Sequence, residues 1–187
     1  MQWIVGAKEN ITQGSIVSGV DWGRGEYNPP LSIVLSNACD FENEKLSFLI
    51  VAALVPAKET LMVTKEYKSK VGCADEGNGL KKKQWESFVN YLMNFIHNKI
   101  VCRYFFFDPQ PEIEAPLLLV DFQQLRSLEV NMLDDLVNEG QLDHPHVEKM
   151  IAQFVGYTGR IPSDRADSQQ EANYLQELRG EYHQDKT

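Results

Sequence analysis

The sequence predicts an α+β domain in which a small antiparallel β-barrel carries added helices. Short apolar runs bounded by turn-forming residues dominate the first part of the chain, as is typical of buried strands. Further along, apolar residues recur at the three- and four-residue spacing of an amphipathic helix. With 187 residues and 43% hydrophobic residues, a single domain can bury an adequate core without a disulfide or a metal.

Three strands are expected in the first third of the chain, after the turn-forming pair Gln13-Gly14. They cover residues 15–20, 31–36 and 46–54. Residues 21–30 are rich in turn formers, and residues 37–44 lie between two apolar runs, so both segments are predicted to be connections.

An amphipathic helix is expected at residues 81–98, where an apolar stripe follows helical spacing. The stripe comprises Trp85, Phe88, Val89, Leu92 and Ile96. Lys81, Lys82 and Lys83 fall in the first turn, where the helix dipole disfavours a positive charge by roughly a few tenths of a kcal/mol. The helix can tolerate a cost of that size.

Strands are expected to resume at residues 101–107, and three prolines in residues 108–116 predict a loop after them. Residues 117–122 and 125–130 then form two short strands or one bent strand. Asp143 can cap a closing helix, and Pro145 lies near its start, where the missing N–H does no harm.

The closing helix is predicted from a second apolar stripe and from the residues that end it. The stripe comprises Val147, Met150, Ile151, Phe154 and Val155. Gly156 or Gly159, followed by Pro162, is expected to terminate the helix.

A strongly polar tail, residues 163–187, is expected to follow the domain at residues 1–162. Its narrow apolar stripe comprises Tyr174, Leu175, Leu178 and Tyr182. A stripe this narrow favours a segment that folds only when it docks on the domain or on a partner, so these four are the candidate partner-binding residues.

The charge of the chain argues against a nucleic-acid partner and favours a protein one. The net charge is -9, whereas a nucleic-acid-binding domain usually carries a basic face. The lysines concentrate in residues 65–70 and 81–83, which are expected to be solvated. An acidic surface suits solubility or docking on a basic protein.

The compartment is expected to be the cytoplasm. Cys39, Cys73 and Cys102 are odd in number and lack the paired spacing of a secreted disulfide framework. Residues 1–13 show no signal-peptide pattern, and the longest apolar runs are far shorter than the ~20 residues that span a bilayer. No cofactor is indicated.

Catalytic or metal chemistry at the cysteines receives little support. Cys39 and Asp40 end a predicted strand, but a cysteine nucleophile needs a base, for which His97 is the candidate. A metal site would recruit Cys39, Cys73, His97 and Cys102, which lack metal-binding spacing. The favoured interpretation is a buried, inert cysteine.

Four other residues are assigned structural roles. His144 and His146 flank Pro145 and are expected to make solvent contacts at the start of the helix. Asp121 and Arg126 are expected to form an ion pair at a strand end. Gly23 and Gly25 form a lone G-x-G without a following helix, so no phosphate-binding loop is predicted.

The order of the short motifs resembles that of the MazF/PemK family of toxins. Residues 13–22 (QGSIVSGVDW) resemble the opening "GDIV…VDF" strand, and residues 32–37 (SIVLSN) resemble "AVVLSN". Residues 49–54 (LIVAAL) and 120–128 (VDFQQLRSL) are similar to "VVAPIT" and "ADQVKSI", and residues 145–155 match the closing helix. The resemblance implies an SH3-like barrel over residues 13–57 and 101–156, an insertion at about 58–100, and a homodimer.

The chain departs from the family at the residues that carry its chemistry. The resemblance implies an endoribonuclease with an arginine before the second strand and a threonine or serine after the third. Those positions are Pro30 and Val55 here, and Pro56 follows. Neither a proline nor a valine side chain can stabilise charge on a phosphate or transfer protons. Arg24 or Arg103 can substitute only if it reaches a phosphate; otherwise Arg24 is a surface arginine and Arg103 pairs with a carboxylate.

The sequence therefore predicts a non-catalytic MazF/PemK-like interaction or regulatory module, in a toxin–antitoxin or phage-defence setting such as a CRISPR-linked one. Its partner is expected to be a protein rather than a nucleic acid or a membrane. The alternative is a divergent endoribonuclease with relocated catalytic residues, for which Arg24, Cys39 and Asp40 are the weak candidates. An unrelated α+β enzyme is the remaining hypothesis.

Overall fold

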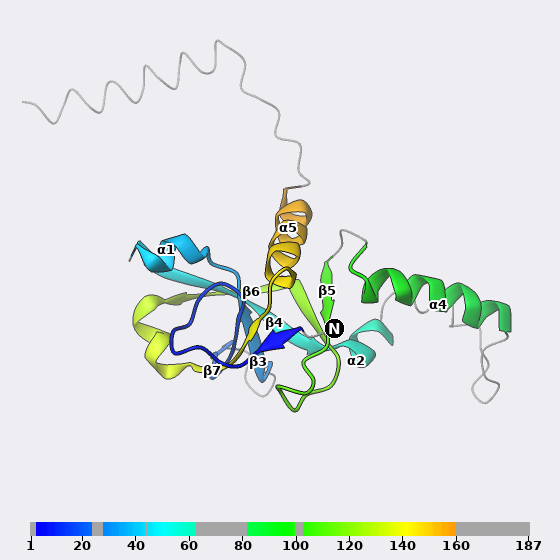
Figure 1. The fold of residues 1–187 in the computed structure, drawn as a ribbon, viewed down its shortest axis with the longest axis horizontal. Coiled ribbons are helices and arrows are strands. Elements are labelled where there is room, and N and C mark those ends of the chain that lie inside the picture. Colours follow the sequence, from blue (N-terminus) through cyan, green and yellow to red (C-terminus); the bar gives the residue numbers. More distant parts are fainter. Residues whose placement is uncertain (1–2, 24–27, 44, 63–81, 100–102, 160–187) are drawn as a thin grey trace, which may run out of the picture. The chain divides into compact units, whose positions relative to one another are not determined.

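The fold was analysed in a computed structural model of the full chain (Figure 1). The structure describes residues 3–23, 28–43, 45–62, 82–99 and 103–159. The chain divides into two units, Met1–Tyr157 and Thr158–Thr187, and the elements below belong to the first, apart from the last residue of the closing helix. The predicted tail, with Tyr174, Leu175, Leu178 and Tyr182, lies outside the described residues.

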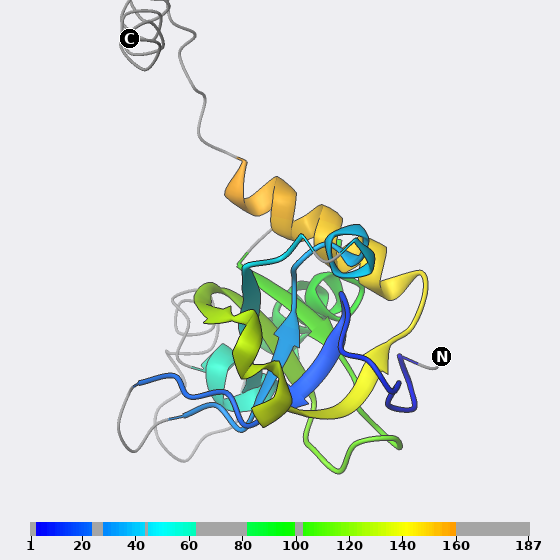
Figure 2. The same cartoon turned by 90° about the vertical axis from the view of Figure 1, so that its left-hand side faces the viewer.

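A curled sheet of seven antiparallel strands forms the body of this unit, as Figures 1 and 2 show from two sides. The strands are β1 (Ile4–Val5), β2 (Ser15–Ser18), β3 (Leu31–Val34), β4 (Phe48–Pro56), β5 (Tyr104–Phe107), β6 (Leu118–Glu129) and β7 (Val137–Leu142). Their order is β1-β7-β2-β3-β4-β6-β5. No pairing joins β1 to β5 among the described residues, so the sheet is a half-barrel within an α+β fold.

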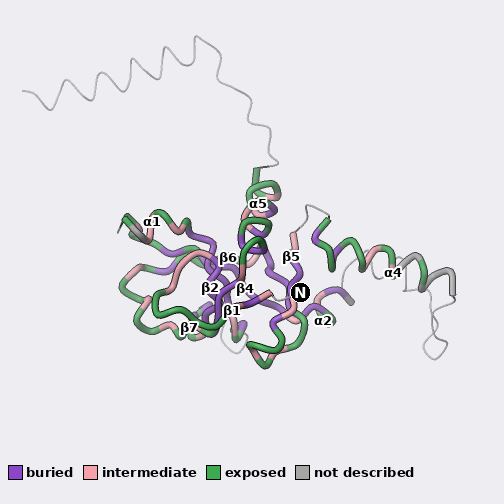
Figure 3. Tube along the Cα trace, in the orientation of Figure 1, coloured by how far each residue is buried: buried purple, intermediate pink, exposed green. Residues whose placement is uncertain are grey.

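The central strands are buried on both faces, which explains their uninterrupted apolar sequence. In β4, Leu54 faces one core cluster together with Ile33, while Val55 faces a second cluster together with Val34. Figure 3 shows the buried residues following the strands. The first cluster is covered by the closing helix and the second by the helices of the middle segment.

The helices are short except for two. They are α1 (Ala38–Glu42), α2 (Ala57–Met62), α4 (Lys82–Ile96), the 3-10 turn η1 (Val130–Asp135) and α5 (His146–Thr158). None of the helices in the described ranges is long and apolar enough to cross a membrane.

The end of α4 is fixed by Asn98, which has a left-handed backbone with φ of 48°. The N–H of Asn98 donates to the Phe95 carbonyl (2.7 Å), and the N–H of Lys99 donates to the Asn94 carbonyl (2.9 Å). These two bonds are the pattern of a Schellman cap, in which asparagine replaces the more usual glycine.

The Asn98 side chain also ties α4 to the sheet. Its amide group donates to the Phe106 carbonyl at 2.7 Å, and its oxygen accepts from the Phe106 N–H at 2.8 Å. The next backbone acceptor along β5, the Tyr104 carbonyl, accepts from the Gln153 amide of α5 at 2.7 Å. Side chains from two helices therefore bind the outer edge of β5.

The segments predicted at residues 117–122 and 125–130 belong to one bent strand, β6, rather than to two strands. In the ladder between β4 and β6, Ala52 pairs with Leu125 but its neighbour Ala53 pairs with Asp121. The intervening residues 122–124 form a bulge, which bends a strand and increases its twist. Of the two predicted alternatives, two short strands or one bent strand, the bent strand is therefore confirmed.

Several local predictions were wrong. Residues 37–44 contain α1 as well as a connection, because the Asn37 side chain accepts from the Cys39 N–H (3.1 Å) and caps a short helix. Val155 is 59% exposed and does not belong to the buried stripe of α5. Of the two glycines predicted to end α5, Gly156 lies within the helix, whereas Gly159 directly follows its last residue, so the second alternative is confirmed.

Gly14 gives the first testable prediction, because its φ of +82° and its surroundings exclude a side chain. A Cβ there would lie 2.7 Å from Val147 Cγ2 and 2.9 Å from Gln141 Nε2. Replacing Gly14 by alanine is expected to lower the free energy of unfolding by about 2 kcal/mol, through left-handed strain and overpacking. Gly6→Ala is the control, since nothing lies within 4 Å of its Cβ position. Equal urea midpoints for the two variants would contradict the prediction.

Candidate functional site

The two positions that the family resemblance assigns to catalysis cannot carry it in this structure. Val55 is 3% exposed and its side chain packs in the second core cluster. Pro30 is exposed just before β3 and has no group that can bind an anion or transfer a proton. Val55, a core residue, therefore occupies the position at which the resemblance expects a hydroxyl group.

The other candidate catalytic residues are not brought together. Cys39 is exposed on α1, which corrects the prediction of a buried cysteine. Asp40 is half-buried in the same helix, where its N–H donates to the Asn37 carbonyl. Among the described residues no cluster of three potential metal ligands exists. Arg24, Cys73 and Cys102 lie outside the described residues.

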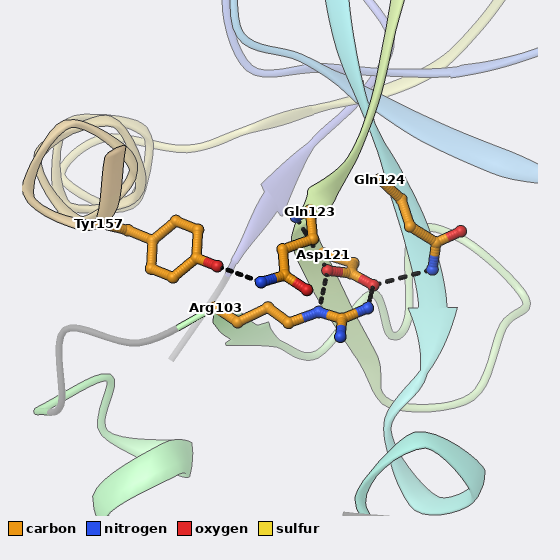
Figure 4. A network of polar contacts seen from close by, with 5 residues as sticks. All are labelled: Arg103, Asp121, Gln123, Gln124 and Tyr157. Carbon is orange, nitrogen blue, oxygen red and sulfur yellow. Dashed lines mark hydrogen bonds and ion pairs between the residues drawn. The ribbon is translucent and has the colours of Figure 1, made fainter. Parts of the chain in front are cut away.

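Arg103 forms an ion pair with a buried carboxylate, as one of the two interpretations of this residue predicted. Its Nε and Nη2 donate to the two oxygens of Asp121 at 2.6 and 2.5 Å (Figure 4). The Asp121 side chain is 1% exposed and that of Arg103 is 37% exposed. The predicted pairing of Asp121 with Arg126 was wrong, because Arg126 lies beyond the bulge and opposite Val51.

The carboxylate of Asp121 also holds the bulge in place. It accepts from the Gln123 N–H at 3.0 Å and from the Gln124 amide at 2.8 Å. Gln123 in turn donates to the Tyr157 hydroxyl of α5 at 2.5 Å, so the network joins three elements (Figure 4). Two donors of the Arg103 guanidinium are therefore engaged by Asp121, and the same carboxylate organises the neighbouring loop.

The electrostatics of this network favour a structural role. The hydrogen bond from Asp121 raises the pKa of Arg103, because a neighbouring carboxylate favours the charged guanidinium. The guanidinium carbon also lies 4.9 Å from the centre of the Tyr104 ring. A cation held in this way remains charged but is already neutralised, so it contributes little to binding a phosphate.

The two histidines at the start of α5 have different environments. His146 is buried and stacks on the Trp3 ring with centroids 4.1 Å apart, which corrects the prediction of solvent contacts. His144 is exposed and its Nδ1 pairs with Glu148 one turn further on. Trp3 also packs edge-on against Phe105 at 6.4 Å, so His146 helps to fix the N-terminal segment.

Glu148 gives a pH-dependent prediction. Its pKa is lowered first by the backbone N–H in the first turn of α5 and then by the hydrogen bond from His144. A depressed folded-state pKa stabilises the protein above the unfolded pKa, and this contribution is lost as the pH falls through the folded value. Because the side chain is exposed, Glu148→Gln should lower the free energy of unfolding by only about 0.5 kcal/mol at pH 7.

The test compares urea unfolding of Glu148→Gln and wild type at pH 7 and pH 3, with Glu9→Gln as an exposed control outside the helices. The difference should shrink as the pH is lowered from 7 to 3, because protonation of the carboxyl group removes its interactions with the backbone N–H and His144. If the difference in the free energy of unfolding grew as the pH fell, the predicted direction of the pH dependence would be contradicted.

An apolar cleft of about 370 Å³ lies between α2 and α4, and we call it the α2–α4 cleft. Leu92, Phe95 and Ile96 of α4 form one wall. The other walls are Ala57 and Leu61 of α2, Phe106 of β5, and the Pro116-Leu117 segment. Lys58 and Glu59 are its only charged lining residues among those described. Pockets of 300–1,000 Å³ with mainly apolar walls are typical binding sites.

Sequence reasoning predicted α4 but not this cleft. Helical spacing placed Leu92 and Ile96 on one stripe. Among the α4 residues whose burial is described, however, Phe95 is the most buried, at 6% exposed, and Ile96 is 39% exposed. The α2 wall was missed because residues 58–79 are mixed and charged. The apolar Leu61 and Met62 within them were the available signal. Side-chain burial is not described for Trp85 and Phe88.

The described residues define an α+β fold with a curled antiparallel sheet and an apolar cleft between α2 and α4. No family model matches the sequence, and no curated protein matches it significantly. The assignment of function therefore depends on the residues themselves.

Proposed function

We propose that the chain is a non-catalytic protein-interaction module of the MazF/PemK type, built on an SH3-like barrel and acting in a toxin–antitoxin or phage-defence system. The observation that carries the proposal is the α2–α4 cleft, an apolar surface that remains open between two helices. Leu117 in its wall is 48% exposed, and a contiguous apolar surface of this kind is characteristic of interaction sites.

The positions of the five motifs support the family component of the proposal. The motifs at residues 13–22, 32–37 and 49–54 fall on β2, β3 and β4, which are consecutive neighbours in the sheet. Those at residues 120–128 and 145–155 fall on β6 and α5. The cleft is formed largely by residues 57–96, which correspond to the insertion relative to that family.

The non-catalytic part of the proposal is supported by the surroundings and chemistry of the candidate catalytic residues. Val55 is part of the core, Pro30 has no usable group, and Arg103 is engaged with Asp121. We therefore expect no cleavage when the purified chain is incubated with a mixed RNA pool in the absence of metal ions. Cleavage that disappears in Arg24→Ala would establish the endoribonuclease alternative and contradict the proposal.

The interaction itself can be tested with a photo-crosslinking amino acid placed at Ile96 in the cleft and, as a control, at Met93 on the same helix. Met93 is 42% exposed but does not line the cleft. We expect one protein adduct from the native host with the probe at position 96 and none with the probe at position 93. RNA adducts at position 96 in place of a protein would contradict the proposal.

A further inference from the structure

We infer that a groove away from the α2–α4 cleft binds a short basic segment of a protein, with one bulky apolar side chain as its anchor. The groove lies between α1, η1 and the segment at residues 8–12, and we call it the α1–η1 groove. In Figure 1, α1 and the yellow-green η1 lie at one end of the sheet, whereas α2 and α4 lie at the other. The inference goes beyond the proposed function because it adds a second interaction surface.

Three adjoining pockets, with volumes of about 360, 410 and 450 Å³, form the groove. The first and second share Leu133, the first and third share Phe41, and the second and third share residues 9–11. Because each pocket has a wall in common with the other two, one short chain segment can occupy them together.

The 360 Å³ pocket is the apolar part of the groove. Its apolar walls are half-buried and comprise Phe41, Leu46, Val130 and Leu133. Asp40 is its only charged lining residue among those described. A cavity of about 150 Å³ accommodates a benzene-sized group, so this pocket has room for one bulky apolar side chain.

The charged residues of the groove are mainly acidic. Glu9, Asp40 and Asp134 line it together with one cation, Lys8, so three negative charges and one positive charge give a net charge of -2. None of the three carboxylates forms an ion pair with another described residue. Carboxylates without a counter-charge favour a basic ligand and disfavour an acidic one, so the charge of the groove selects its partner.

The described charges of the α2–α4 cleft make no such selection. Lys58 and Glu59, its charged lining residues in the described ranges, cancel each other. The α1–η1 groove therefore differs from the cleft in specifying the charge of its ligand. A chain that carries both surfaces can hold one protein in each of them.

The test uses the full chain and three fluorescent 12-residue peptides. The first places lysines around a central tryptophan, the second replaces the lysines by glutamates, and the third keeps the lysines but replaces the tryptophan by serine. Binding is followed by fluorescence anisotropy at 50 and 500 mM salt. We expect the first peptide to bind at least tenfold more tightly than either of the others at 50 mM salt. Its advantage over the glutamate peptide should shrink at 500 mM salt.

Substitutions in the protein locate the binding site. Asp40→Asn combined with Asp134→Asn removes two carboxylates at nearly constant size, and it should weaken binding of the first peptide at least fivefold. Glu114→Gln removes an exposed carboxylate outside the groove, so this matched control should change the affinity less than twofold. Ile96→Ser, in the α2–α4 cleft, should also leave the affinity unchanged. Urea unfolding of each variant checks that the fold is retained.

Several outcomes would overturn the inference. They are failure of the first peptide to bind, tighter binding of the glutamate peptide, and equal binding of the two lysine peptides. If Glu114→Gln weakened binding as much as the double substitution, the attraction would be a general property of an acidic protein. A dimer in analytical ultracentrifugation that the double substitution dissociates would assign the groove to a second copy. Each of these results leaves the proposed function intact, because that function is tested separately at Ile96.

Discussion

Replacing Asn98 by alanine is expected to lower the free energy of unfolding by about 3 kcal/mol, a large fraction of the stability of a small domain. The substitution removes both side-chain partners of the Phe106 N–H and C=O groups, and Phe106 is 7% exposed. A buried backbone group that loses its partner costs about 1–3 kcal/mol. Alanine also adopts the left-handed conformation less readily than asparagine, at a cost of about 1 kcal/mol.

Two further substitutions at this position separate the causes. Asn98→Gly keeps the permissive backbone but loses the amide, so the difference between glycine and alanine measures the conformational part. Asn98→Asp retains an acceptor for the Phe106 N–H and loses the donor to its carbonyl. Asn94→Ala, an exposed site on the same helix, is the control. If urea unfolding placed Asn98→Ala within about 0.5 kcal/mol of wild type, the hydrogen bonds between Asn98 and Phe106 would be shown to be dispensable.

Replacing Asp121 by alanine is expected to cost about 3 kcal/mol. The loss leaves the Arg103 guanidinium and the Gln123 N–H without their buried acceptor. Removing one partner of a buried ion pair typically costs about 3–5 kcal/mol, and the value here falls at the lower end because Arg103 is 37% exposed and can be rehydrated.

A double-mutant cycle tests whether the ion pair itself carries this energy. Arg103→Met should destabilise the protein because it leaves a buried carboxylate without its cation. The double variant Arg103→Met with Asp121→Leu should be more stable than the sum of the single losses predicts, with a coupling energy of about 2 kcal/mol. Additive losses in urea unfolding would mean that the two side chains act independently. Leu125→Ala, an exposed residue of the same strand, is the control.

The parts of the fold that the sequence predicted are those whose stability is local or apolar. β3 and β4 were expected because their residues form uninterrupted apolar runs, and α4 was expected from helical spacing. β7 was missed because its sequence, Val-Asn-Glu-Gly-Gln-Leu, is polar. Its pairing with β1 and β2 comes from segments more than 100 residues away, which no local pattern reveals.

The same distinction between local signals and tertiary contacts explains which parts of the candidate site could be predicted. The pairing of Arg103 with a carboxylate was foreseen, but its partner was not, because the bulge at residues 122–124 decides which side chain meets it. Asn98 carries the sequence signal of a helix end, yet its bonds to Phe106 arise only from tertiary packing. The cleft depends on the approach of α2 to α4, so its apolar residues could be recognised only in part.

The hydrogen bonds at the outer edge of β5 have a consequence for behaviour at high concentration. An edge strand with unpaired backbone groups is a template for aggregation, since another chain can add a strand to it. Here Asn98 and Gln153 occupy the Phe106 and Tyr104 groups that such a strand would use. The same two side chains that hold helices on the sheet thus also protect this apolar strand from intermolecular pairing, and losing them would expose an edge rich in phenylalanine to fibril growth.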